Sequence, residues 1–410
     1  MPAAPTTVFR SARVFDGHAF LDAPRDVVVR QGRVAAVEPG SSEIGGGVDV
    51  VECEGRTLVP GLVDAHVHLM VANANPMRSA QEPFSLPFYR SVNSARTMLR
   101  SGVTSARDLT GADAGLREAI DEGVIAGPKL SIAVNALSIT GGHGDNWLRS
   151  GVTLHHTNPS LGVPSGIADG VEEVRKVTRT MLRAGADVIK VCATGGVMST
   201  NDHPDHTQFG LDELRVIVEE AEAHGSYVAA HAIGTQGIKN AILAGARTIE
   251  HAIYLDDEAI ELMLDRDVVL VPTLTAPRQV LEYGGGPSGL PDNILAKARG
   301  VVGRHLDSFR RAVDAGVVVA MGSDSGIGPH GLGLTELPAM AEAGMPVDAI
   351  LRSATSIGAR LLPNVSGVGE IRRGSAADLV LLDLELTASE QLAELPDRIV
   401  GVWKDGALVE

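Results

Sequence analysis

Cysteine is scarce in this chain of 410 residues, which carries only Cys53 and Cys192. Two thiols far apart in the chain, with no CxxC pair, exclude a disulfide-rich scaffold and fit a reducing compartment. The N-terminus lacks a basic segment followed by an apolar one, so no signal peptide is predicted. Long apolar runs are also missing, since none reaches the roughly 18 residues of a transmembrane helix. We therefore expect a cytoplasmic protein without a membrane span.

Basic residues are also fewer than acidic residues in this chain. The chain has 35 Lys and Arg residues against 51 Asp and Glu residues, which gives a net charge of −16. An acidic surface repels phosphate backbones and anionic lipid headgroups, so neither nucleic acid nor a membrane surface is an expected partner. Hydrophobic residues make up 44% and charged residues 21% of the chain, as in ordinary globular proteins, which excludes general disorder. A small molecule is the expected partner.

From about residue 60 onward, amphipathic helical segments alternate with short apolar runs. Residues 171–185 (VEEVRKVTRTMLRAG) repeat apolar residues at helical spacing and end in glycine, and the apolar run 187–193 (DVIKVCA) follows. Alternating strand and helix predicts parallel strands joined by helical crossovers, and eight such units indicate an α/β fold of the (β/α)8 TIM barrel type. The expected strands are 59–68, 103–109, 129–137, 187–193, 226–232, 247–252, 268–274 and 317–324.

Both chain ends show a different pattern, with short strand-like runs between glycine-rich turns. Residues 7–59 alternate apolar and polar residues, and the same style returns after a last helical segment at 346–363. We therefore predict a small composite β-sandwich domain built from residues 1–60 and 364–410. The barrel between these two pieces is expected to span residues 61–363.

Several expected strands end in side chains that bind metal ions. Active sites of such barrels lie at the carboxyl ends of the strands, so these side chains are expected to share one rim. Alternate residues of a strand point to the same side, so His66 and His68 form a pincer suited to a cation such as Zn²⁺. The candidates, in chain order, are His66, His68, Lys190, His231, His251 and Asp324.

Each candidate alone also fits a structural role. A single buried histidine is more often a core residue than a ligand, and Asp324 within GSDSG is equally typical of a turn. Lys190 is harder to explain, because it lies inside the apolar run DVIKVCA and an unpaired buried ammonium group is costly. This amine must find a partner, lose its proton or be covalently modified. The occurrence of all candidates on successive strand ends favours a metal centre.

The motifs around these residues resemble the amidohydrolase superfamily. They are VDAHVHL, VIKVCATGG, AAHAIG, IEHAIYL and MGSDSG, together with the C-terminal segment from Gly369 to Asp383, so the resemblance covers nearly the whole chain. The strings ATGGVMS (193–199), TGGHGD (140–145) and TQF (207–209) are similar to the branch of cytoplasmic binuclear-zinc dipeptidases and N-acyl-amino-acid hydrolases, often labelled imidazolonepropionase-like.

The resemblance implies a binuclear centre with two divalent metal ions, expected to be zinc. His66, His68 and Asp324 would hold the first ion, and His231 and His251 would hold the second. A hydroxide would bridge the ions and attack the scissile carbonyl, because two cations depress the pKa of a shared water to near neutrality.

The same resemblance assigns further roles. Lys190 would be carboxylated by CO₂, and its carbamate would bridge the two ions, which resolves the cost of the buried amine. Asp324 would take the proton of the attacking water and deliver it to the leaving amine. His143, in the loop after the third strand, would donate to the carbonyl oxygen or hold the substrate, with loop stabilisation as the alternative. Tyr227 would bind the substrate's α-carboxylate or fill the barrel core, and His330 is a weaker candidate for a substrate contact.

The expected function is hydrolysis of the amide bond in small dipeptides or N-acyl amino acids. The same site would also suit a carbamate, a phenylurea, a lactone or an amide toxin such as an ochratoxin-type amide. An imidazolonepropionase or a mononuclear deaminase fits less well, because those relatives lack the bridging lysine that Lys190 supplies. A scaffold protein without activity fits least, since all expected ligand positions are filled. Relatives of this branch often assemble, so we expect a homo-oligomer.

Overall fold

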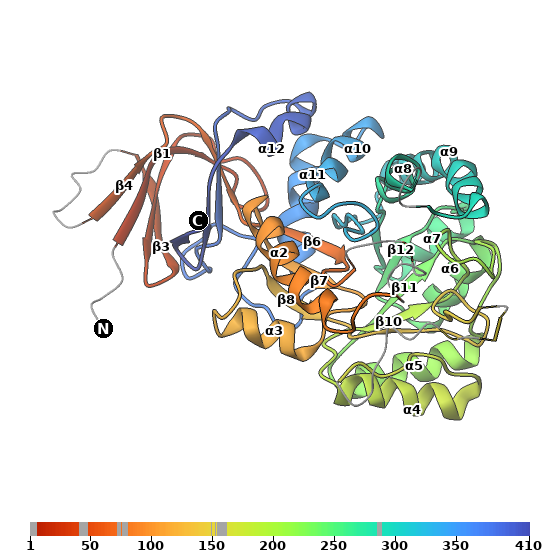
Figure 1. Cartoon of the computed structure of the whole chain (residues 1–410). Coiled ribbons are helices and arrows are strands. Elements are labelled where there is room, and N and C mark those ends of the chain that lie inside the picture. The colour runs from red at the N-terminus through yellow and green to blue at the C-terminus, as the bar shows by residue number, and fades with distance from the viewer. Residues whose placement is uncertain are drawn as a thin grey trace.

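The computed structural model describes residues 6–40, 48–71, 75, 81–148, 150–151, 153, 162–284 and 289–410. The chain forms two parts that lie side by side (Figure 1). The first strands and the C-terminal end share one part, which is built of β-strands. Parallel strands surrounded by helices make up the other part.

A mixed sheet joins the two chain ends. β5 (Thr57–Pro60) lies in its middle, where it pairs in parallel with β1 (Thr6–Val14) and antiparallel with β14 (Leu379–Leu382). Both halves of the sheet share one apolar core, in which Phe9 and Trp403 meet edge to face with ring centroids 4.7 Å apart. The predicted sheet domain is thus confirmed, whereas its exact boundaries remain predictions. The other strands are β2 (Arg25–Arg30), β3 (Arg33–Pro39), β4 (Val48–Glu52), β15 (Ile399–Lys404) and β16 (Ala407–Leu408).

The chain passes from the sheet to the barrel at Gly61. A Cβ atom at this position would lie 2.1 Å from Thr104 Oγ1, so a glycine is needed for the backbone to pass this close. The strand predicted at 59–68 is therefore divided between two sheets. Its start belongs to β5, and its remainder forms β6 (Leu62–Val67) of the barrel.

The parallel strands form a barrel, which confirms the predicted fold. They pair in chain order, and a backbone hydrogen bond of 2.7 Å from Asp187 N to Ile132 O joins the two parallel sheets. The strand predicted at 129–137 is broken into β8 and β9 where Val134 takes a positive φ of 63°. After β6, the barrel strands are β7 (Val103–Asp108), β8 (Lys129–Ile132), β9 (Ala136–Leu137), β10 (Ile189–Cys192), β11 (Val228–Ala232), β12 (Thr248–His251) and β13 (Val269–Val271).

The last barrel segment, predicted as a strand at 317–324, closes the barrel without a regular ladder. Backbone hydrogen bonds join it to β13 on one side and to β6 on the other, where Asp324 N donates to His66 O at 2.8 Å. Between these contacts, Met321 N donates to Ser353 O at 3.1 Å instead of to a neighbouring strand. Asp324 has a positive φ of 58°, so the extended backbone ends at the residue that carries the carboxylate.

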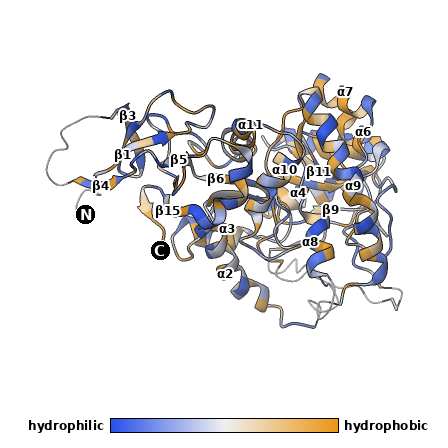
Figure 2. Cartoon of the chain, turned by 90° about the horizontal axis from the view of Figure 1, so that it is seen from above, coloured by the Kyte–Doolittle hydropathy of each residue, from blue (hydrophilic) through white to orange (hydrophobic). Residues whose placement is uncertain are grey.

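Helices follow the strands and cover the outside of the barrel (Figure 1). α4 (Gly170–Arg183) shows the sequence basis, because its buried residues Val174, Thr178 and Met181 recur every three to four positions. Figure 2 shows hydrophilic and hydrophobic residues alternating along α7 and α8 in the same way. The other helices are α2 (Leu86–Arg100), α3 (Ala114–Asp121), α5 (Leu211–Ala223), α6 (Thr235–Ala244), α7 (Asp257–Asp265), α8 (Ala276–Tyr283), α9 (Asp292–Ala315), α10 (Glu336–Glu342), α11 (Val347–Arg352) and α12 (Leu395–Arg398).

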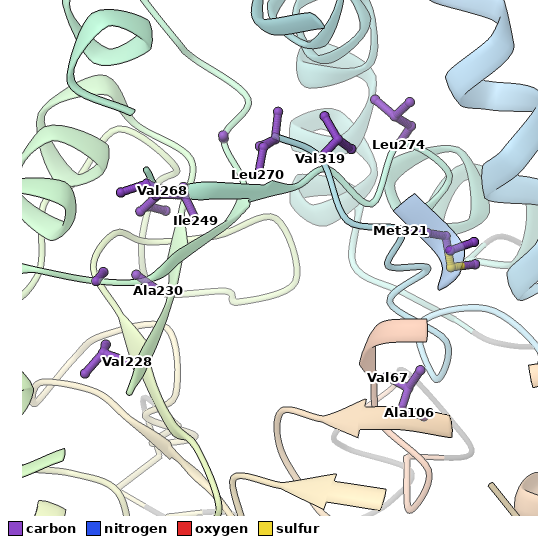
Figure 3. Packing of buried hydrophobic residues seen from close by; sticks show 14 of the residues in the cluster. Val67, Ala106, Val228, Ala230, Ile249, Val268, Leu270, Leu274, Val319 and Met321 are labelled. Carbon is purple, nitrogen blue, oxygen red and sulfur yellow. The ribbon is translucent and has the colours of Figure 1, made fainter. Parts of the chain in front are cut away.

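The main apolar core joins the strands to these helices. Figure 3 shows side chains from successive strands in this core, among them Ile249 of β12 and Leu270 of β13. Val319 of the last segment lies beside Leu270, to which it is paired by a parallel bridge. Close packing of this kind leaves little freedom to the strands. The core therefore fixes where the carboxyl ends of the strands lie.

Candidate metal centre

The six predicted metal ligands line the same pocket, which has a volume of about 760 Å³. They come from the carboxyl ends of strands on different sides of the barrel, as the strand order requires. β6, β10, β11 and β12 supply most of them, and the irregular last segment supplies the carboxylate. The pocket is lined by His66, His68, Lys190, His231, His251 and Asp324, among other residues.

Asp324 lies against the two histidines of the first strand. Its Oδ1 atom is 3.1 Å from His68 Nε2 and 3.5 Å from His66 Nε2. One ligand atom each of His66, His251 and Asp324 lies within 4.8 Å of the other two. The ring centroids of His231 and His251 are 4.6 Å apart, so the cluster continues across the pocket. This buried group of imidazoles and one carboxylate suits divalent metal ions.

Hydrogen bonds orient the imidazole rings. In three of the rings a partner at Nδ1 leaves Nε2 available to a metal ion, which is how histidines in metal sites are usually held. His231 is turned the other way, since its Nε2 lies 3.2 Å from Gly195 O and Nδ1 is left for a metal ion. The three Nδ1 contacts are His66 to Glu250 Oε2 at 2.8 Å, His68 to Thr110 O at 3.0 Å, and His251 to Thr273 Oγ1 at 2.7 Å.

Burial and charge set the protonation states that metal binding needs. Burial lowers the pKa of His66 to about 4 and lowers the pKa of His231 and His251 well below the ordinary value, so these rings are neutral. Burial alone would raise the pKa of Asp324, but His66 and His68 beside it outweigh that effect and hold the pKa well below its usual range. For His68, burial alone would lower the pKa, but Asp324 beside it raises the pKa. The cluster therefore offers neutral nitrogen atoms at His66, His231 and His251 and an ionised carboxylate at Asp324.

Backbone strain gathers at the same residues. His251, Ala252 and Asp324 have φ angles of 72°, 49° and 58°, in a region that side chains other than glycine rarely adopt. Each such residue costs on the order of 1–3 kcal/mol, so the fold must hold it there. Strained backbone at two of the clustered side chains, His251 and Asp324, is typical of a functional site.

Lys190 lies in this cluster, and its amine has no hydrogen-bond partner among the described residues. The residue is 4% exposed. Burial lowers the pKa of this amine, because the site provides no compensating contact for the charged form. An orphaned amine surrounded by metal-binding side chains fits an amine that is converted to a carbamate and shared by metal ions.

A buried ion pair beneath the cluster was not predicted from the sequence. Arg107 of β7 donates from Nη2 to Glu250 Oε1 at 2.9 Å, and both side chains are fully buried. Arg107 Nε also donates to Ala65 O at 2.6 Å. Glu250 in turn accepts from His66, so the pair fixes the first histidine. The signal available in the sequence was a charged residue inside each of two apolar strand segments, SARDL and TIEHA.

His143 lies at the pocket as predicted. Its ring is stacked on His231 with centroids 4.4 Å apart and an interplanar angle of 15°. Gly196 makes this close approach possible, because a Cβ atom there would lie 2.1 Å from His143 Cε1. For the alternative role of His143, in stabilising the loop, the contact is weaker, since Asp202 Oδ2 lies 3.6 Å from its Nδ1 and no hydrogen bond joins them.

Two predicted substrate contacts do not reach the pocket. The hydroxyl of Tyr227 donates to Leu361 O at 2.6 Å and accepts from Arg107 at 3.0 Å, in the barrel core at the start of β11. The expected contact of Tyr227 with a substrate carboxylate is therefore not supported. His330 faces the backbone, with Nε2 3.1 Å from Val71 O, and does not line the pocket.

The outer wall of the pocket is mainly apolar. Phe88 of α2 and Phe84, which precedes this helix, contribute to it together with Pro277 and Val280 of α8. Arg90 is the only arginine among the described lining residues. A pocket with few charged groups outside the metal cluster suits a substrate with an apolar body.

A model of the amidohydrolase family matches residues 57–409. The chain belongs to this family. Membership confirms the predicted family and identifies a metal-dependent hydrolase that acts on C–N bonds. Within the described part of the chain, no helix has both the length and the apolar character that crossing a membrane requires.

The chain is similar to proteins with several different names. Ochratoxinase of Aspergillus niger is 36% identical over 365 residues, which cover 86% of this chain and 75% of that protein. A solved prolidase structure with bound N-methylphosphonate-L-proline has a TM-score of 0.90 at 34% identity and covers 99% of both chains. A Xaa-Pro dipeptidase structure with methionine in its active site has a TM-score of 0.89 at 30% identity, covering 99% of this chain and 100% of that one.

Proposed function

We propose that this chain hydrolyses the amide bond of small dipeptides or N-acyl amino acids with two zinc ions. The observation that carries the proposal is Lys190, whose buried amine has no partner among the described residues and lies among four histidines and Asp324. CO₂ would convert that amine to a carbamate, an anion that two cations stabilise. The similarity to prolidase and Xaa-Pro dipeptidase structures supports the substrate class.

The donor set divides between two ions. His66, His68 and Asp324 would hold one ion, His231 and His251 the other, and the carbamate would be shared. Two such cations, when bound, lower the pKa of water toward neutrality and polarise a carbonyl oxygen. The division is taken from the family resemblance, and it agrees with Asp324 lying against His66 and His68 and with His231 lying against His251. His251 also lies near His66 and Asp324, so the two proposed sites adjoin.

The protein's own groups would move the proton and hold the substrate. Asp324 would take the proton of the attacking water at a carboxylate oxygen and pass it to the leaving amine. His143 would contact the carbonyl group from its place beside His231. The apolar wall with Phe84 and Phe88 would pack against the side chain or acyl group of the substrate.

A substrate panel tests this function. The panel contains dipeptides, N-acyl amino acids and an ochratoxin-type amide, and the assay includes zinc and bicarbonate. We expect the highest kcat/KM for a dipeptide or an N-acyl amino acid. No hydrolysis of any of these amides by the metal-loaded chain would refute the proposal.

A second candidate is an amide toxin as the preferred substrate. The 36% identity to ochratoxinase favours it, because that relative covers most of this chain. The aromatic side chains of the pocket wall would suit a flat aromatic acyl group. The same substrate panel distinguishes the two candidates. This second candidate is supported if kcat/KM is higher for the ochratoxin-type amide than for every dipeptide and N-acyl amino acid.

Arg90 is proposed as the anchor for the substrate's carboxylate. It lines the pocket, its Nη1 donates to Glu82 Oε2 at 2.5 Å, and its other N–H groups have no acceptor among the described residues. We expect Arg90→Met to raise KM about 10-fold or more for an N-acyl amino acid, because charge-assisted hydrogen bonds are worth roughly 1.5–3 kcal/mol. KM for the matching amino-acid amide should stay unchanged.

A matched control for Arg90 lies on the same helix. Arg96 of α2 is exposed and does not line the pocket, so Arg96→Met should leave both KM values unchanged. Steady-state kinetics of the two variants with both substrates provides the measurement. An equal rise of KM for the acid and the amide would remove Arg90 from this role.

Glu250 should affect metal binding through His66. Burial alone would raise the pKa of Glu250, but Arg107 and His66 lower it to about 2, so the group accepts hydrogen bonds as a carboxylate. Replacing a group that orients a metal-binding histidine typically weakens metal binding about 10- to 100-fold, and we expect this for Glu250→Gln. Competition with a chelator measures it, with the exposed Glu258→Gln as control. An unchanged affinity would contradict the assignment.

A further inference from the structure

The segment that follows β10, residues 193–206, is held from outside the barrel by α9. Lys297 of α9 has a side chain that is only 11% exposed. Its Nζ donates to the carbonyl oxygens of Gly196, Ser199 and Asp202 at 2.6, 2.7 and 3.3 Å. The Oδ1 atom of Asp202 lies 3.7 Å from the same nitrogen. One ammonium group thus contacts three carbonyls and one carboxylate of this segment.

Asp202 lies between this cation and His143, without a hydrogen bond to the ring. Its Oδ2 atom lies 3.6 Å from His143 Nδ1 and accepts a hydrogen bond from Gln208 Nε2 at 3.2 Å. Its Oδ1 atom accepts from the hydroxyl of Ser199. The side chain is 4% exposed, so water contributes little to its orientation. These few partners therefore fix the carboxylate that faces His143.

His143 is confined by the same segment. Gly196, whose carbonyl oxygen binds Lys297, leaves no room for a Cβ atom, which would lie 2.1 Å from His143 Cε1. The stacking on His231 at 4.4 Å restricts the ring further. A shift of residues 193–206 would therefore move the His143 ring directly.

Packing alone does not require a lysine at this position. Val197 of the same segment already packs with Ile294 and Ala298 of α9 in an apolar cluster. Burying an ammonium group and a carboxylate costs desolvation, so such a pair is weak evidence of a contribution to stability. Its directional contacts instead specify one arrangement of the segment.

We propose that Lys297 is a positioning residue for amide hydrolysis. Through Asp202 and the carbonyls of residues 193–206, it holds the His143 ring at the pocket, where the carbonyl group of the substrate binds. The inference rests on the proposed function, in which His143 touches the substrate. It adds a residue outside the barrel strands to the machinery of the reaction.

Lys297→Met tests the role of the charge, because methionine fills a similar space without it. We expect kcat to fall by up to about 100-fold at unchanged metal content, since a misplacement of about 1 Å has a cost of that order. Lys297→Arg keeps a cation with several donors and should recover most of the lost kcat. The matched control is Lys239→Met, because Lys239 is 13% exposed, forms ion pairs with Asp256 and Glu258, and does not line the pocket.

A double-mutant cycle separates positioning from a general structural effect. If Lys297 acts through His143, then adding Lys297→Met to a His143→Asn variant costs no further activity. Losses that multiply in the double variant would overturn the proposal. A Lys297→Arg variant as slow as Lys297→Met would also count against it.

Hydrogen exchange of the metal-free protein gives a readout independent of activity. Peptides from residues 193–206 should exchange faster in Lys297→Met than in the wild type, and Lys239→Met should leave them unchanged. Unchanged exchange in Lys297→Met would overturn the proposal whatever the activity. Failure of the wild type to hydrolyse any amide would refute the proposed function, and the exchange result would still decide whether Lys297 holds this segment.

Discussion

Lys190→Ala is expected to lose metal and activity together. In the proposed centre the carbamate on this lysine is the anion that both ions share, so without it the ions lack a ligand. A metal ion contributes several kcal/mol to the transition state, and each ~1.4 kcal/mol is a factor of ten, so kcat/KM should fall about 1,000-fold or more. Elemental analysis after dialysis should show metal falling from about two ions per chain toward one or none.

The metal-free protein provides an independent test of the same lysine. Burial lowers the pKa of Lys190, and its amine has no partner among the described residues, so the side chain is costly until it is modified. Lys190→Met should therefore raise the melting temperature of protein kept free of metal and CO₂. Lys404→Ala is the control, because Lys404 donates to Gly127 O at 2.8 Å in the sheet domain. For the Lys190→Ala variant of the first experiment, wild-type metal content and wild-type turnover would rule out the carbamate.

The clustering of the metal-binding side chains could be predicted from the sequence because a parallel barrel brings all strand ends to one rim. His66, His231 and His251 each end an apolar run, and the alternation along a strand sets the side to which they point. Their grouping in the structure follows from these two rules alone. The roles of the individual ligands toward metal ions stay predictions.

Distance along the strand explains why Tyr227 takes the second of its two expected roles, in the barrel core. It precedes His231 by four residues, and even spacing puts both side chains on the same side of β11. At about 3.3 Å per residue, however, four residues separate them by roughly 13 Å. Tyr227 therefore lies near the opposite end of the barrel, where Arg107 and Leu361 O bind its hydroxyl.

Contacts between distant segments were beyond prediction from spacing. Arg107 and Glu250 come from β7 and β12, and nothing in either strand alone indicates that the two charges meet. The same holds for Lys297 and Asp202, which belong to a helix and a loop. The division of the apolar run 59–68 between two sheets could not be predicted either. Both pieces are apolar, so the sequence does not mark the point where one sheet ends and the other begins.

Asp324→Asn is expected to bind substrate and lose most of its turnover. Asparagine keeps the shape of the side chain and one oxygen atom that can face a metal ion, but it does not take up a proton as a carboxylate does. General acid–base catalysis contributes about 10²–10⁴-fold, so kcat should fall by that factor while KM changes little. Steady-state kinetics together with metal analysis of the same preparation provides the measurement.

The two roles of Asp324, as metal ligand and as proton carrier, give different results in this experiment. If only proton transfer is lost, metal content stays at the wild-type level and kcat falls alone, because C–N bond cleavage then lacks its proton acceptor. If metal content falls in proportion to kcat, Asp324 acts only as a ligand. Asp314→Asn on the exposed face of α9 is the control and should match the wild type. An unchanged kcat in Asp324→Asn would remove this carboxylate from the proton path, and the attacking water would need a different base.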